Sequence, residues 1–85
     1  MTKEQKQKEY SDYGADYIAF IIERDGELKR GFWDKMDFPE FCQTMANANY
    51  PPFDPELTGI KDDGNLYECA LVAAWKAVQD YFNAR

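Results

Sequence analysis

The C-terminal part of the chain constrains the fold most, because residues 66–83 carry apolar side chains at helical spacing. Successive members of this set are three or four residues apart, which places them on one face of an α-helix. Asn65 and Glu68 stand at the spacing of a capping box at the start of the segment. A helix with one apolar face needs an apolar partner, so the rest of the chain must supply one. The apolar set is Tyr67, Leu71, Ala74, Val78 and Phe82.

Residues 37–46 predict a second and shorter helix. Asp37 suits the N-cap position, Glu40 completes a capping box, and Pro39 is tolerated in the first turn of a helix. The apolar residues that follow recur at the spacing of one helical face. They are Phe38, Phe41, Cys42, Met45 and Ala46.

Residues 17–33 predict a β-hairpin. Their first half is rich in strand-forming side chains, and Asp25 followed by Gly26 is a strong turn signal. A two-residue loop would mix apolar and polar side chains on each face. A three-residue loop over 24–26, with Gly26 left-handed, separates them and is therefore favoured. The apolar face would then carry Ile18, Phe20, Ile22, Leu28 and Phe32.

The chain of 85 residues is long enough for one small domain. The expected fold class is α+β, with an antiparallel β-hairpin packed against two helices in the order β-β-α-loop-α. Because two strands alone are marginally stable, a third strand would come from residues 57–60, from the N-terminal side or from a second copy. We expect residues 1–14 to form a polar tail or a short helix, and residues 15–85 to form the single domain.

Acidic residues concentrate in the middle of the chain. The protein has 16 Asp and Glu against 10 Lys and Arg, a net charge of −6. Residues 34–68 hold eight of the acids and two of the bases, which accounts for the whole net charge. This segment is either an ordinary solvated surface, in which two acids cap a helix, or a docking surface whose acids and aromatic rings meet a basic partner. The predicted contact residues are Tyr50, Phe53, Asp54, Glu56, Asp62 and Asp63.

Residues that usually carry catalysis or bind metals are scarce. The chain has no histidine, and Cys42 and Cys69 form no Cys-x-x-Cys pair, so we expect no metal site. Both cysteines are interpreted as small core side chains, with a disulfide or a reactive thiol as the alternative. The acidic turn at 62–64 fails the calcium-loop pattern. Because GxSxG, phosphate-loop and GxGxxG motifs are also missing, we expect no enzyme activity and no cofactor.

The N-terminal residues 1–9 are charged and lack the apolar stretch of a secretory signal. Apolar runs such as 18–22 are far shorter than the roughly 20 residues of a membrane span. An acidic chain is also repelled by nucleic-acid phosphates and by anionic lipids. We expect a cytoplasmic protein that binds neither membranes nor nucleic acid directly.

Several short pieces of the chain resemble the N-terminal part of plasmid antirestriction proteins. Together they extend over roughly half of the chain. That family consists of DNA mimics that occupy the DNA site of restriction enzymes, so the resemblance implies an inhibitor of such an enzyme. Members of the family are longer and more acidic, and residues 66–83 have no counterpart there. The pieces are Tyr17-Ile18-Ala19, Gly26-Glu27-Leu28, Gly31, Trp33, Asp37-Phe38 and Asp54-Pro55-Glu56-Leu57.

Together these observations predict a small, non-enzymatic binding protein. Its acidic and aromatic surface would occupy a basic, nucleic-acid-binding site on a larger protein, as an anti-defence inhibitor from a phage or mobile element does. The alternative is a structural or assembly protein, a homodimer for example, that self-associates through the exposed face of the predicted sheet. That face would carry Tyr17, Ile21 and Trp33.

Overall fold

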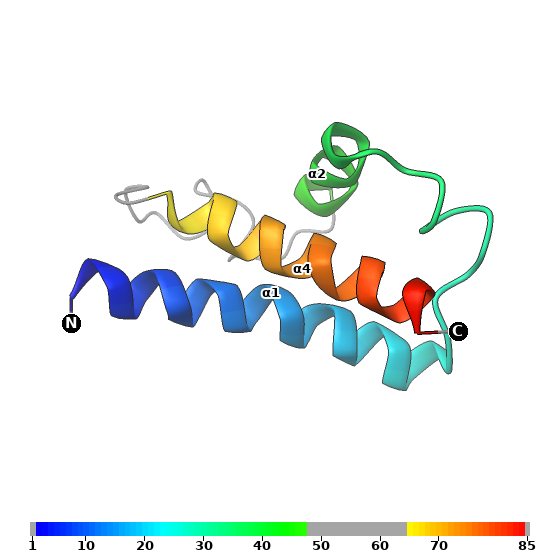
Figure 1. Ribbon diagram of the computed structural model, residues 1–85, viewed down its shortest axis with the longest axis horizontal. Coiled ribbons are helices and arrows are strands. Elements are labelled where there is room, and N and C mark those ends of the chain that lie inside the picture. The colour runs from blue at the N-terminus through cyan, green and yellow to red at the C-terminus, as the bar shows by residue number, and fades with distance from the viewer. Residues whose placement is uncertain (1, 48–64, 85) are drawn as a thin grey trace.

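Three helices make up most of the structure, a computed structural model that describes residues 2–47 and 65–84. They are α1 (Lys3–Asp25), α2 (Phe38–Ala46) and α4 (Leu66–Asn83). Figure 1 shows α1 and α4 lying side by side and running in the same direction, while α2 crosses over α4. Within the described ranges, none of the helices is long and apolar enough to cross a membrane.

The α+β fold with a hairpin over residues 17–33 is wrong, because the described residues hold no strand. Residues 17–25 are instead the last turns of α1. The buried side of this helix follows Tyr10, Gly14, Ile18 and Ile21, at spacings of four, four and three residues. As a helix, this segment buries its apolar side against α4, whereas an isolated hairpin would be marginal.

The ends of α1 explain why the turn signal was misread. Gly26 has φ 83° and donates its backbone N–H to the carbonyl of Ile22 at 2.7 Å, so it ends the helix as a left-handed C-cap. The left-handed conformation expected of Gly26 is confirmed, but it closes a helix and not a hairpin. At the other end, Thr2 and Gln5 form a capping box with bonds of 3.1 and 2.8 Å.

The boundary expected between residues 14 and 15 falls inside α1. Tyr10 and Gly14 are both buried, and Tyr10 belongs to the hydrophobic core. The first part of this helix therefore packs with the rest of the protein.

The two helices predicted at residues 37–46 and 66–83 are confirmed. The capping box of α2 is formed, since Asp37 accepts from the Glu40 N–H at 2.9 Å and Glu40 accepts from the Asp37 N–H at 3.4 Å. The second capping box is wrong. Asn65 adopts a left-handed conformation with φ 58° and its side chain makes no capping hydrogen bond to α4.

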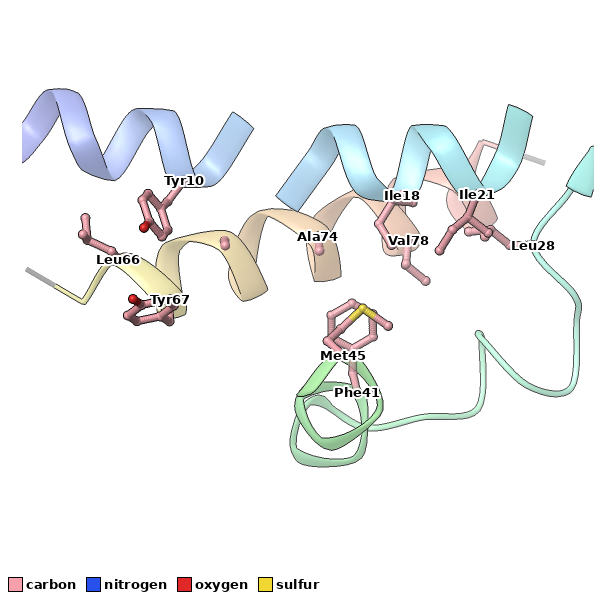
Figure 2. Packing of buried hydrophobic residues seen from close by; sticks show 11 residues of the cluster. Tyr10, Ile18, Ile21, Leu28, Phe41, Met45, Leu66, Tyr67, Ala74 and Val78 are labelled. Carbon is pink, nitrogen blue, oxygen red and sulfur yellow. The ribbon is translucent and has the colours of Figure 1, made fainter. Parts of the chain in front are cut away.

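The contact between α1 and α4 is close because small residues line it. Figure 2 shows Tyr10 near Leu66 and Tyr67 at one end of this contact, and Ile18 and Ile21 near Val78 towards the other. Between these ends, Gly14 lies against the backbone of Ala70. A Cβ built on Gly14 would stand 1.9 Å from the carbonyl oxygen of Ala70, so only glycine fits there.

Aromatic rings dominate the contact between α2 and α4. Phe41 is fully buried and its ring lies 5.2 Å from that of Trp75, with Phe38 at 5.8 Å on the same indole. Trp33, from the segment that joins α1 to α2, adds a ring at 6.4 Å from Phe41. Edge-to-face arrangements of this kind contribute beyond their buried area.

The segment between α1 and α2 is held to the end of α4. Leu28 is buried, and its backbone N–H donates to the hydroxyl of Tyr81 at 3.2 Å. The Arg30 guanidinium lies 5.6 Å above the ring of Phe82. The apolar hairpin face expected for this region is wrong as well, because Phe20 and Phe32 are exposed while Ile18 and Leu28 are buried.

Candidate functional site

The outward side of α1 carries a row of carboxylates. Its members are separated by three, four and seven residues, spacings that return to the same side of a helix. No Lys or Arg occurs between the first and the last member. At a rise of 1.5 Å per residue the row is about 21 Å long. We call these residues the acidic row: Glu9, Asp12, Asp16 and Glu23.

Three members of the acidic row, Asp12, Asp16 and Glu23, are exposed, and Glu9 is half-buried. Glu9 accepts a short hydrogen bond from the hydroxyl of Tyr13. Asp12 pairs with Lys8 at 3.1 Å, with both side chains largely exposed. Exposed pairs of this type contribute little free energy, so Asp12 stays available to another cation.

An exposed aromatic ring interrupts the acidic row. Phe20 lies four residues after Asp16 and three before Glu23, and 55% of it is exposed. The Arg24 guanidinium stands 5.7 Å from the centre of this ring and also bonds the Asp25 carboxylate at 2.9 Å. These hydrogen bonds from Arg24 lower the pKa of the Asp25 carboxyl.

Carboxylates around an exposed ring form a surface that suits a basic protein. The acids attract a positively charged partner, and the ring supplies apolar contact area at the centre. The helix fixes these side chains to one backbone, so little ordering of the chain is needed when a partner binds.

The six residues predicted to contact a partner lie outside the described residues: Tyr50, Phe53, Asp54, Glu56, Asp62 and Asp63. Other acids of the segment 34–68 have local structural roles. Asp37 and Glu40 cap α2, as expected of two of these acids. Asp34 accepts a hydrogen bond from the Gly31 N–H at 2.6 Å, which closes the turn before α2.

The residues predicted for self-association do not share an exposed face. Ile21 is buried in the core with 5% of it exposed, and Tyr17 and Trp33 are partly buried against the same core. The sheet on which that proposal depended does not form in the described part of the chain, because residues 17–25 are helical.

The sequence analysis missed the acidic row because residues 17–33 were interpreted as a β-hairpin. Its signal is present in the sequence. Apolar or small residues recur at 10, 14, 18 and 21, and acids recur at 9, 12, 16 and 23 on the other side. A helical periodicity that began before residue 17 would have revealed both sides at once.

Cys42 and Cys69 are free thiols, each half-buried. Burial raises the pKa of the Cys42 thiol, and the negative charge of Glu68 adds to this effect. Across residues 2–47 and 65–84 there is no group of three or more Cys, Asp or Glu side chains placed to hold a metal ion.

Comparisons with protein-family models, with curated proteins and with solved structures give no match for this chain.

Proposed function

We propose that this protein is a small cytoplasmic binding protein that docks through acidic side chains on a basic site of a larger protein. The observation that carries the proposal is the acidic row of α1, with the exposed ring of Phe20 inside it. The natural setting is the inhibition of a nucleic-acid-handling enzyme, such as a defence nuclease, by a phage or mobile element.

The charge density of the acidic row indicates what kind of contact it makes. Duplex DNA carries one negative charge per roughly 1.7 Å, or about 12 charges over the ~21 Å of the row. The row supplies four carboxylates. It therefore replaces part of the phosphate charge that a basic site recognises, and apolar contact at Phe20 supplies specificity. The four predicted acids at 54, 56, 62 and 63 would add further charge.

Affinity capture from bacterial lysate at low and moderate salt tests this proposal. The bait is the tagged full-length chain, compared with a variant that neutralises the acidic row through Glu9→Gln, Asp12→Asn, Asp16→Asn and Glu23→Gln. Amide side chains keep the size of the acids and preserve the helix. A matched control neutralises four exposed acids outside the row through Glu4→Gln, Glu27→Gln, Asp34→Asn and Asp80→Asn.

The proposal predicts one near-stoichiometric partner that binds the unmodified chain and the control, is lost from the row variant, and weakens as salt rises. Duplex DNA should also compete with this protein for binding to the purified partner. A third bait, with Asp54, Glu56, Asp62 and Asp63 all changed to Lys, tests the loop separately. Equal capture by the unmodified chain, the row variant and the loop variant would contradict the proposal.

A further inference from the structure

A hollow of about 460 Å³ lies between α1 and α4, away from the acidic row. Gln7 and Ser11 form its wall on α1. Its wall on α4 is apolar in the middle, where Cys69, Val72 and Ala73 face the opening. Val72 is the most exposed large aliphatic side chain of the described residues, with 46% of it accessible.

The α4 wall has the geometry of a helix-packing hole. Four of its residues stand at positions i, i+3, i+4 and i+7, the diamond that receives one side chain of a facing helix in knobs-into-holes packing. Val72 belongs to this diamond and is itself an exposed apolar side chain of suitable size. The four residues are Cys69, Val72, Ala73 and Lys76.

The charges beside the hole are arranged symmetrically about Val72. Glu68 lies four residues before it and Lys76 lies four residues after it, and both are exposed. They are about 12 Å apart along α4, too far to pair within one helix. Neither forms a salt bridge with any other residue in the described ranges.

We propose that the occupant of this hollow is a second copy of the chain, whose α4 lies antiparallel to the first across a two-fold axis near Val72. In this arrangement Glu68 of each copy faces Lys76 of the other, so both charges gain a partner. Val72 of each copy enters the hole of the other. Asn65 and Gln79, each seven residues from Val72, face one another as well. An isologous contact of this kind is the commonest form of homodimer.

This dimer does not rest on the proposed function, because the acidic row is not part of the hollow. The contact is small and its ion pairs are at the surface, so association is reversible and concentration-dependent. Each charge reversal at Glu68 or Lys76 affects two symmetry-related pairs. Loss of both pairs and the new repulsion together weaken association by about tenfold or more, since 1.4 kcal/mol corresponds to tenfold.

Sedimentation equilibrium of the full chain, from micromolar to millimolar concentration, tests the proposal with Glu68→Lys, Lys76→Glu and the double variant. The single changes shift the net charge in opposite directions, yet both must weaken association. The double variant restores the pairs with exchanged signs and must regain dimer formation. Glu27→Lys and Lys6→Glu serve as matched controls outside the hollow and the acidic row, and leave association unchanged. A monomer at every concentration, or single reversals without effect, would overturn the proposal.

Disulfide trapping supplies an independent readout that does not depend on charge. In a Cys42→Ser, Cys69→Ser background, Val72→Cys places one thiol near the two-fold axis, so mild oxidation should give a covalent dimer. Phe32→Cys is similarly accessible, since 49% of Phe32 and 46% of Val72 are exposed, but it lies outside the hollow and should stay monomeric. A dimer that forms as fast with Phe32→Cys as with Val72→Cys would exclude the proposed arrangement.

Discussion

The two contacts made by α4 are built in opposite ways. Towards α1, the contact has small residues at its centre, and Gly14 meets the backbone of Ala70. Towards α2, it consists of aromatic rings, with Phe41 and Phe38 packed against Trp75. The first contact leaves no room for a larger side chain, and the second depends on the apolar area that the rings bury. Substitutions that add volume should therefore damage the first, and substitutions that remove volume should damage the second.

This difference also explains how α4 can hold the other two described helices together. The close approach of the two backbones aligns α1 along α4, so the charged side of α1 faces away from α4. The rings of α2 then pack against Trp75 on another side of α4, and Trp33 packs against Phe41. The candidate binding surface is thus a consequence of the contact at Gly14, because that contact determines which side of α1 faces outward.

The largest effect is expected at the aromatic contact. Phe41→Ala removes a fully buried ring and should lower the free energy of unfolding by about 3–5 kcal/mol. Chemical denaturation measures this change, and Phe32→Ala is the matched control because the ring of Phe32 is half exposed. Equal losses for the two variants would show that Phe41 is not at the centre of this contact.

A somewhat smaller loss is expected at the close contact, where added volume is the cause. Gly14→Ala should destabilise the protein by about 1–3 kcal/mol, because the new methyl group must push α1 away from Ala70. In an exposed helix the same change would stabilise by about 1 kcal/mol, so the sign of the effect is diagnostic. A more stable Gly14→Ala variant would contradict the close approach of the two helices.

Gly26, the C-cap residue of α1, differs from Gly14 in having free space around it. A methyl group on Gly26 would meet no atom within 4 Å, so only its positive φ resists substitution. Gly26→Ala should therefore cost about 1 kcal/mol through backbone strain at the C-cap. Gly26→Asn, which tolerates the left-handed conformation better, should recover part of this loss. Full stability of Gly26→Ala would show that α1 does not end in that cap.

The smallest effect concerns the pH dependence of the contact between α2 and α4. Because the pKa of Cys42 is raised in the folded protein, the unfolded chain releases this proton first. The contribution of the thiol to stability is complete below its ordinary pKa of 9.0 and is lost as pH rises through the folded value. Unfolding free energy should thus fall more steeply above that pH in the unmodified protein than in Cys42→Ser. Parallel curves would contradict the raised pKa.

The sequence predicted the helices that start with clear periodicity and failed where two signals conflicted. In α2 the apolar spacing and the capping box agree, and in α4 the apolar spacing was sufficient although its expected capping box does not form, so both helices were expected correctly. At residues 18–22 the strand-forming side chains and the Asp25-Gly26 pair favoured a hairpin. Packing against α4 overrides this local preference, because as a helix the segment continues the buried side of Tyr10 and Gly14 through Ile18 and Ile21.

The candidate site was not predicted either, because it depends on that helix. The acids at 9, 12, 16 and 23 lie on one side only when residues 9–23 form one continuous helix. The role of Gly14 has no local sequence signal. Glycine is required there because the backbone of Ala70, 56 residues further along the chain, lies against it. Contacts of this type depend on tertiary structure, and no local pattern reveals them.

Backbone NMR of the full chain tests directly whether residues 3–25 form one helix in close contact with α4. We expect positive Cα secondary shifts throughout residues 17–25 and a nuclear Overhauser contact between the α-protons of Gly14 and the methyl group of Ala70. Negative Cα shifts over residues 18–22, with cross-strand contacts around residues 24–26, would contradict it and would remove the acidic row as a continuous surface.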